Sequence, residues 1–176
     1  MATGLRDSAK SLQAENEADL EAGREAGLSK AMIDRLTLSP DRIEKMARSL
    51  EEVADLRDPV GEVLEGYVRP NGLRIERVRV PIGVILTIYE SRPNVTSDVA
   101  GLCLKSGNAS VLRGGKESLR SNLAIHRVLA DALAATDLPA DAVQMVDTPD
   151  RDLLAALLRQ DETIDQLLVC ALTGGH

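Results

Sequence analysis

The sequence predicts an α/β fold in which leading helices and a β-hairpin precede an open, mostly parallel sheet. Helix-forming residues dominate the first third of the 176-residue chain, an Asn-Gly turn follows, and short apolar strands then alternate with helical segments. Apolar residues make up 44% of the sequence, which is enough to fill one sizeable core. Because Tyr67 and Tyr89 are the only aromatic residues, aliphatic side chains must fill that core.

Residues 1–56 are predicted to form a helical lead-in. Ala, Glu, Leu and Arg dominate Ser8–Leu36. Ser39 then precedes Pro40, a pair typical of a helix N-cap followed by proline at the first helical position. From Asp41 to Leu56 apolar residues recur at helical spacing while charges occupy the other face, which predicts an amphipathic helix.

Residues 62–80 are predicted to form a two-stranded ribbon. Glu65–Arg69 and Leu73–Val80 flank the turn Pro70-Asn71-Gly72, in which Asn-Gly supplies the positive φ angles that a tight hairpin needs. An isolated two-stranded ribbon is marginally stable in water. We therefore expect it to pack on another subunit or domain.

From residue 81 to residue 170 apolar strands alternate with helical segments. This alternation predicts right-handed crossovers and an open parallel sheet. Strands are expected at Ile82–Tyr89, Ala109–Leu112, Ala142–Val146 and Gln166–Cys170, and helices at Thr96–Lys105, Lys116–Ala135 and Arg151–Arg159.

The charge balance argues against nucleic acid as a partner. Acidic residues outnumber basic ones by 28 to 21, and the formal net charge of -7 would repel a phosphate backbone. Met1–Glu17 lacks the apolar segment of a secretory signal, and the longest apolar stretch, Ile82–Tyr89, is too short to span a bilayer. Two cysteines without paired spacing fit a reducing compartment, so we expect a cytoplasmic protein that does not bind a membrane.

No metal site is expected. His126 lies on an amphipathic helix and His176 is terminal, and neither has other candidate ligands at metal-binding spacing. Cys103 lies among apolar residues of a short helix, where a buried and unreactive thiol is expected rather than a nucleophile.

Two loops that follow predicted strands are the candidate sites, because ligands of an open parallel sheet bind beyond the carboxyl ends of its strands. The first loop is Glu90–Asn94, followed by a helix that Thr96, Ser97 or Asp98 is expected to cap. The second loop is Arg113–Ser118, which ends one strand and opens the long helix.

The second loop resembles an anion cradle that would fit a phosphorylated cofactor. Its glycines let the backbone approach a ligand, a helix N-terminus offers amide donors, and two cations flank them. It is not a Walker A loop, since Glu117 follows Lys116 where Ser or Thr is needed, and the sequence has no G-x-G-x-x-G fingerprint. An ordinary turn remains the alternative here. For the first loop the alternative is a surface ion pair of Glu90 with Arg92 and a mere helix-cap role for Asn94.

Three stretches of the sequence carry a further signal. They read Val80-Pro81-Ile82-Gly83-Val84-Ile85 through Ile88–Thr96, then Leu102–Ala109, then Leu112–Glu117. Together they closely resemble the gamma-glutamyl phosphate reductase family of the aldehyde dehydrogenase superfamily, and the likeness runs from the leading helices to about Leu168. The resemblance implies that residues 1–176 form an incomplete, Rossmann-like cofactor-binding domain. It also implies that the catalytic domain is absent here.

For the activity, the resemblance implies NADPH-dependent reduction of L-glutamyl 5-phosphate to L-glutamate 5-semialdehyde, with release of phosphate, in proline biosynthesis. In this family a cysteine thiolate displaces the phosphate to give a thioacyl enzyme, and hydride from NADPH then gives the aldehyde. Such covalent catalysis needs a positioned thiolate and hydrogen-bond donors aimed at the developing oxyanion.

The same resemblance assigns roles to residues of the first loop. Asn94 matches the asparagine whose side-chain amide helps to form the oxyanion hole of the superfamily. Ser91, Arg92 and Pro93 match the stretch that lies beside the nicotinamide end of the cofactor.

In the second loop, Arg113 takes the position of the lysine that contacts the adenosine ribose, with Gly114, Gly115 and Lys116 in the same cofactor-binding turn. Many NAD-using relatives carry an acidic residue near Lys116. A lysine would instead attract a 2′-phosphate, which favours NADPH. The ribbon of residues 62–80 falls where relatives carry an oligomerisation hairpin, so a homo-oligomer is expected of the full-length protein, with glutamate kinase as a further partner.

The end of the sequence departs from the family. After Leu168 the chain reads Val169-Cys170-Ala171-Leu172 and ends at His176, where the family continues with proline, arginine and glycines. Cys170 does not lie in the context of the catalytic nucleophile. We therefore expect a truncated chain that is inactive alone and that aggregates or partly unfolds in isolation. Two alternatives remain open: a noncatalytic nucleotide-binding or oligomerising fragment, and a relative with another acyl substrate, against which the Tyr89–Asn94 string argues.

Overall fold

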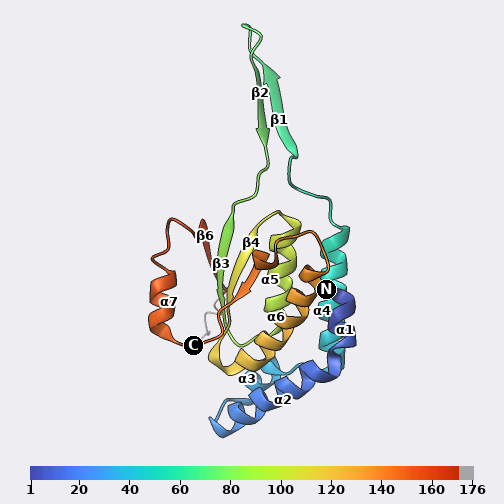
Figure 1. Ribbon diagram of the computed structural model, residues 1–176, viewed down its shortest axis with the longest axis vertical. Coiled ribbons are helices and arrows are strands. Elements are labelled where there is room, and N and C mark those ends of the chain that lie inside the picture. The colour runs from blue at the N-terminus through green and yellow to red at the C-terminus, as the bar shows by residue number, and fades with distance from the viewer. Residues whose placement is uncertain (171–176) are drawn as a thin grey trace.

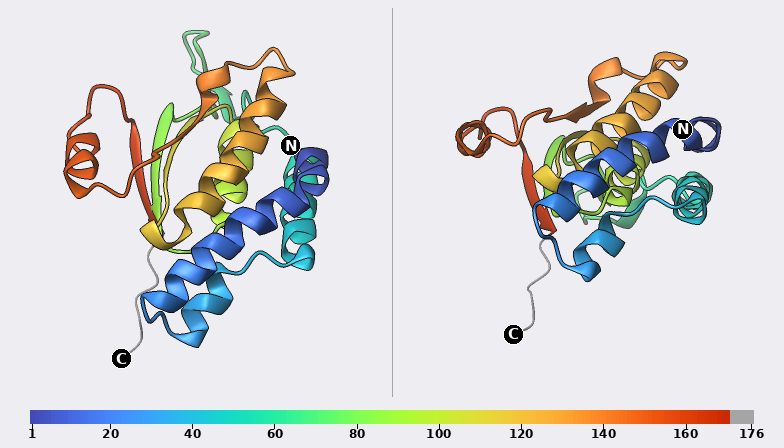
Figure 2. Two further views of the ribbon diagram at one scale, coloured as in Figure 1. Left: turned by 60° about the horizontal axis from the view of Figure 1, so that its bottom comes forward. Right: turned by 90° about the horizontal axis from the view of Figure 1, so that it is seen from below.

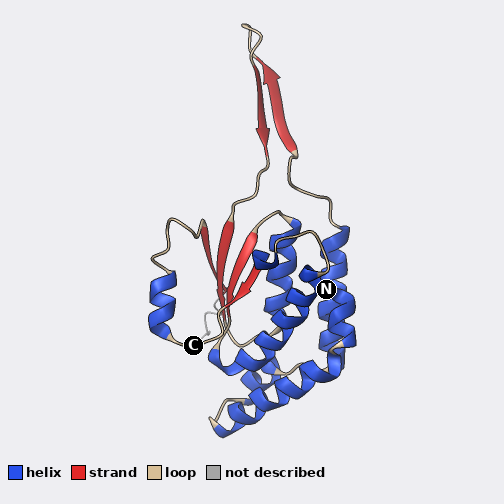
Figure 3. Ribbon diagram, viewed as in Figure 1, coloured by secondary structure: helices blue, strands red, loops and turns tan. Residues whose placement is uncertain are grey.

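Four parallel strands form the central sheet of the computed structural model, which describes residues 1–170 (Figures 1 and 3). The strand order is β5-β4-β3-β6, so each helical connection runs from one strand to a parallel strand. The predicted α/β class is thereby confirmed. Residues 171–176 lie outside the described residues, and with them most of the stretch after Leu168 for which a departure from the family is predicted. The strands are β3 (Val84–Tyr89), β4 (Ala109–Arg113), β5 (Val143–Met145) and β6 (Gln166–Cys170).

Two of the helices that connect the strands cover one face of the sheet. These are α5 (Asn94–Lys105) and α6 (Leu119–Ala134), which pack against each other and against β4 and β5. A third, α7 (Arg151–Leu157), lies on the other side of the sheet, beyond β6 (Figures 1 and 2). The core between the sheet and the first two helices is aliphatic, as the composition predicts, apart from one tyrosine. Its central members are Tyr89, Ala100, Leu112, Ile125, Leu129 and Val143.

The lead-in consists of α1 (Ala2–Asp7), α2 (Ala9–Glu25), α3 (Lys30–Leu36) and α4 (Pro40–Asp55). The predicted start of the last helix is confirmed, because the Ser39 hydroxyl accepts a hydrogen bond of 3.2 Å from the backbone nitrogen of Arg42. Figure 2 shows α2 lying along α6, and the two helices pack closely. The lead-in is therefore part of the same core as the sheet.

Two buried polar side chains of α2 anchor the lead-in to the start of α6. The side-chain nitrogen of Asn16 donates to the Leu36 carbonyl at 2.9 Å and to the Ser121 hydroxyl at 3.0 Å. Its side-chain oxygen accepts from the Leu38 backbone nitrogen at 2.7 Å. The Asp19 carboxylate accepts from both the nitrogen and the hydroxyl of Ser121, at 2.8 and 2.7 Å. Burial raises the pKa of Asp19, while these hydrogen bonds oppose the rise.

The predicted ribbon is present as β1 (Val63–Val68) and β2 (Arg74–Val78), paired antiparallel, but its turn differs from the prediction. Among the described residues only glycines have positive φ, so Gly72 (φ 87) is left-handed and Asn71 is not. Asn71 instead accepts a hydrogen bond from the Leu73 nitrogen at 3.1 Å. The loop thus has three residues closed by a left-handed glycine, because the Asn side chain stabilises its own turn.

The ribbon projects from the rest of the molecule (Figure 1). Several of its apolar side chains are exposed, with Tyr67 at 49% and Val68 at 67% of their full exposure. Such apolar exposure on a marginal two-stranded element is what a contact with another chain or domain would cover. That contact stays a prediction.

None of the described helices is long and apolar enough to cross a membrane. Within residues 1–170 no group of three or more His, Cys, Asp or Glu side chains is arranged to hold a metal ion.

Candidate functional site

The two candidate loops meet at the carboxyl edge of the sheet. β3 and β4 are adjacent and parallel, with Ile88 opposite Arg113, so both strands end at the same edge of the sheet. There the Ser91 hydroxyl donates a hydrogen bond of 2.9 Å to the Glu117 carboxylate. A Cβ atom at Gly115 would lie only 2.9 Å from the Ser91 hydroxyl oxygen. The two loops therefore form one region at this edge of the sheet.

At position 114 the packing leaves no room for a side chain, so glycine is required there. A Cβ atom at Gly114 would lie 2.1 Å from the side-chain nitrogen of Asn122 and 3.1 Å from the Tyr89 ring. Asn122 cannot move aside easily, because it is fully buried and its nitrogen also donates to the Ser118 hydroxyl at 3.0 Å. The turn after β4 thus lies close against α6 and the end of β3.

A buried series of hydrogen bonds, which the sequence did not predict, joins the end of β3 to α5 and α6. The Tyr89 hydroxyl and the Thr96 hydroxyl are 2.7 Å apart, and Thr96 also donates to the Asn122 side-chain oxygen at 3.2 Å. Burial raises the pKa of the Tyr89 phenol, so it stays protonated and able to donate. The readable signal was a lone tyrosine at the end of an aliphatic strand, whose hydroxyl must find a partner when buried.

The predicted cap of α5 is wrong. The helix begins at Asn94, two residues before the predicted start, because Pro93 already has helical angles (φ -58, ψ -31) at the N-cap position. Thr96 and Ser97 are consequently buried within the first turns. Asp98 accepts a hydrogen bond of 3.0 Å from the side-chain nitrogen of Asn94, and this is a side-chain pair rather than a helix cap.

The two cations of the second loop differ in exposure and in hydrogen bonding. Lys116 is exposed at the start of a single 3₁₀ turn, Lys116–Ser118, which precedes α6. One terminal guanidinium nitrogen of Arg113 donates to the Pro149 carbonyl at 3.2 Å, whereas its Nε is buried and has no partner among the described residues. A buried donor without a partner is costly, which is a reason to expect an acceptor there. Glu117, which accepts the hydrogen bond from Ser91, adds one negative charge to the second loop.

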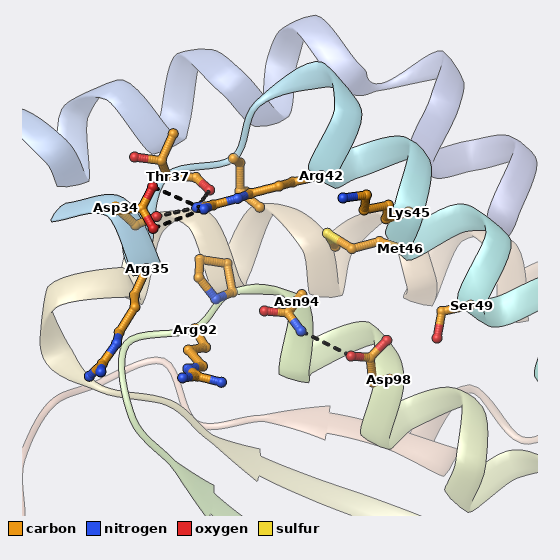
Figure 4. A pocket seen from close by; sticks show the side chains of 12 residues that line it. Asp34, Arg35, Thr37, Arg42, Lys45, Met46, Ser49, Arg92, Asn94 and Asp98 are labelled. Atoms are coloured by element: carbon orange, nitrogen blue, oxygen red, sulfur yellow. Dashed lines mark hydrogen bonds and ion pairs between the residues drawn. The ribbon is translucent and has the colours of Figure 1, made fainter. Parts of the chain in front are cut away.

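A pocket of about 480 Å³ opens beside the first loop, between the α3–α4 region and the start of α5 (Figure 4). Sequence reasoning placed Arg92, Pro93 and Asn94 near a ligand but missed the opposite wall, since residues of α3 and α4 reach the pocket only through helix packing. The lining residues are Asp34, Arg35, Thr37, Leu38, Arg42, Lys45, Met46, Ser49, Arg92, Pro93, Asn94 and Asp98.

The charges of this pocket are unevenly paired. The guanidinium of Arg42 is already paired within the protein. It contacts both carboxylate oxygens of Asp34 at 3.0 and 3.1 Å and donates to the Thr37 carbonyl at 2.9 Å. Arg35, Lys45 and Arg92 form no ion pair with any carboxylate in the part of the chain that the structure describes. The expected alternative, a Glu90–Arg92 pair, is therefore not formed.

Cys103 behaves as the sequence predicts. Its side chain is 6% exposed, and burial raises the pKa of the thiol, which disfavours the thiolate. Both features disfavour a role as a nucleophile.

The fold is that of a class of proteins, the dehydrogenases of the aldehyde dehydrogenase type. The chain superposes on a propionaldehyde dehydrogenase from Rhodopseudomonas palustris (TM-score 0.63, 19% identity, 97% of this chain and 36% of that one). It also superposes on an engineered glycolyl-CoA reductase with bound NADP+ (TM-score 0.63, 20% identity, 97% of this chain and 36% of that one). At such identities the likeness concerns the fold. No protein-family model matches the chain.

Within that class, the chain is similar to gamma-glutamyl phosphate reductases. The relative from Rhodospirillum rubrum is 58% identical over 95% of this chain and 39% of its own length. The crystal structure of the Thermotoga maritima enzyme superposes with a TM-score of 0.94 at 43% identity, over 98% of this chain and 42% of that one. The resemblance found in the sequence is thereby confirmed, and the chain spans about two fifths of the length of the relatives it matches.

Proposed function

We propose that this chain provides the cofactor-binding part of an enzyme that reduces L-glutamyl 5-phosphate to L-glutamate 5-semialdehyde, with release of phosphate, in proline biosynthesis. The observation that carries the proposal is the junction of the two loops by the Ser91–Glu117 hydrogen bond of 2.9 Å. It sits at the carboxyl edge of a parallel sheet, where ligands of such folds bind. The naming of the sequence relatives, at 50% identity and above, supports the substrate.

A phosphorylated dinucleotide fits the residues at this edge. The Nε of Arg113 has no hydrogen-bond acceptor among the described residues, and the exposed Lys116 adds a positive charge to the same loop. When bound, the dinucleotide would supply the hydride. The chain's own residues would hold and orient this dinucleotide. Lys116 and Arg113 would contact its adenosine end, and Ser91, Arg92 and Pro93 would lie at its nicotinamide end.

Asn94 is proposed as the donor to the oxyanion of the acyl group. Its side-chain nitrogen gives one of its two hydrogens to Asp98, so the other remains for the substrate oxygen. Such a preoriented donor stabilises the charge that develops on that oxygen.

Titration of NADPH and NADH fluorescence with the purified chain tests the cofactor part of the proposal. The wild-type chain is expected to bind NADPH more tightly than NADH. Lys116→Gln should weaken NADPH binding about tenfold, by loss of one charge-assisted contact, and leave NADH binding unchanged. Lys10→Gln, on the exposed side of α2, is the matched control. A correctly folded chain that binds neither nucleotide would refute the proposal.

A noncatalytic nucleotide-binding fragment is the second candidate, and the burial of Cys103 favours it, since burial disfavours the thiolate that the reaction needs. Phosphate-dependent reduction of NADP by the semialdehyde separates the two candidates. Turnover by the chain supports the enzyme, whereas nucleotide binding without turnover supports the fragment.

We also propose that the ribbon β1–β2 joins copies of the protein. Its exposed Tyr67 and Val68 are the contacts a second copy would cover. Replacing both by Thr should lower the mass measured by analytical ultracentrifugation, and an unchanged mass would contradict this role.

A further inference from the structure

We infer that Asp98 and Lys45 determine substrate specificity, by holding the ammonium and the carboxylate of the amino-acid end of the substrate in the pocket beside Asn94. This inference rests on the proposed function, since it assumes that Asn94 faces the reacting acyl group. It adds a recognition site for the other end of the same molecule. The ligand class is an α-amino acid whose side chain carries an activated or reduced carboxyl group.

The walls of the pocket have matched spacing. Lys45 and Ser49 lie four residues apart on α4, and Asn94 and Asp98 lie four residues apart on α5. Residues at this spacing share one helix face and are about 6 Å apart along the axis. The two helices pack together, and Figure 4 shows both pairs lining the pocket between them. The pocket is therefore a slot with two levels, one helical turn apart.

The charges of the slot suit a ligand with several negative groups and one positive group. Arg42 already neutralises Asp34, with contacts of 3.0 and 3.1 Å. The lining charges that remain are Arg35, Lys45 and Arg92 against the single carboxylate of Asp98. A net positive pocket stands out in a chain with a formal charge of -7, and it would concentrate an anionic ligand. L-Glutamyl 5-phosphate has this pattern, with a phosphate, a carboxylate and one ammonium group.

The length of the glutamyl chain matches the distance between the two levels. Three C–C bonds and the C–N bond, of about 1.5 Å each, join the acyl carbon to the ammonium nitrogen and span about 5 Å in extended form, close to the rise of about 6 Å between the two levels. With the acyl group at Asn94, the α-ammonium would reach Asp98, and the long, exposed side chain of Lys45 would reach the α-carboxylate from the opposite wall. Figure 4 shows Arg35 and Arg92 at the opposite end of the slot, where the phosphate would lie.

Asp98 has a second connection that the test must separate from recognition. It accepts the hydrogen bond of 3.0 Å from Asn94, so it also orients that amide. A residue that only orients Asn94 would affect every acyl ligand alike. A residue that binds the ammonium would affect only ligands that carry one.

Two ligands that differ only in the ammonium group make this distinction. L-Glutamate 5-methyl ester has the amino-acid end and a neutral acyl end, whereas monomethyl glutarate lacks the ammonium. Isothermal titration of the full chain with each is expected to show tighter binding of the amino acid. Asp98→Asn should weaken binding of the amino acid about tenfold or more and leave that of monomethyl glutarate unchanged. Lys45→Met should weaken both, because both carry the carboxylate. Asp131→Asn and Lys10→Met are the matched controls, at exposed positions of α6 and α2.

Three results would overturn the inference. The first is unchanged affinity in Asp98→Asn, the second is equal losses for both ligands in that variant, and the third is a wild-type chain that binds neither ligand. Lys45 is exposed, so its variant keeps the test decisive if Asp98→Asn fails to fold. NADPH binding, measured on the same samples, reports on the proposed function separately. A chain that binds NADPH and shows one of these three results would disprove only the recognition site.

Discussion

The Ser91 hydroxyl donates a hydrogen bond of 2.9 Å to the Glu117 carboxylate, and this contact joins the loop after β3 to the turn after β4. A double-mutant cycle measures how strongly the two loops are coupled. Ser91→Ala and Glu117→Ala should each reduce the free energy of unfolding, and the double variant should reveal a coupling of about 1 kcal/mol. Urea denaturation of the four proteins checks this. Additive losses would show that the contact does not couple the loops.

Gly114 is predicted to tolerate no side chain. In Gly114→Ala the new Cβ would fall 2.1 Å from the side-chain nitrogen of Asn122, which is buried and cannot withdraw. We expect a loss of about 1–3 kcal/mol in the free energy of unfolding, as for other overpacked cores. Gly66→Ala is the control, since its Cβ would meet Glu76 at an ordinary 3.4 Å. Similar losses in both variants would contradict the packing argument.

Asn16 is predicted to stabilise the packing of the lead-in helices against α6 through its buried hydrogen bonds. Asn16→Ala removes hydrogen bonds to Leu36, Leu38 and Ser121, and it leaves buried groups without partners. The expected loss is about 2–3 kcal/mol of unfolding free energy, measured by chemical denaturation. Gln13→Ala, on the same helix at a partly exposed position, should change stability by much less.

Acid should weaken the contact between α1 and α4. Arg6 donates to Glu44 at 2.9 Å, and Arg48 adds a second contact, so the pKa of Glu44 falls from 4.5 to about 2. Since the folded-state pKa is depressed, the stabilisation is complete above about pH 4.5 and is lost as pH falls towards 2.

Melting temperatures between pH 6 and pH 2 test this, with Arg6→Met for comparison. The difference between wild type and variant should shrink as pH falls through this window. A constant difference would show that the ion pair does not contribute.

Much of the fold was predictable because its signals are local. The Ser39-Pro40 helix start, the aliphatic strand Val84–Tyr89 and the helices between strands follow from periodicity and capping, which operate over a few residues. The meeting of the two loops was predictable as well, since parallel neighbours must end at one edge of a sheet. The start of α5 was misjudged, because Pro93 began the helix before any capping side chain.

The sequence alone determined the order of elements, the parallel sheet, the loops at its carboxyl edge and the likeness to gamma-glutamyl phosphate reductases. Only the tertiary structure decided that Lys45 and Ser49 of α4 face Asn94 and Asp98 of α5 across one pocket. The same holds for the buried chain from Tyr89 through Thr96 to Asn122. The physical reason is range: helix and strand patterns are written in neighbouring residues, whereas a pocket depends on which helix faces pack together, and no local pattern specifies that.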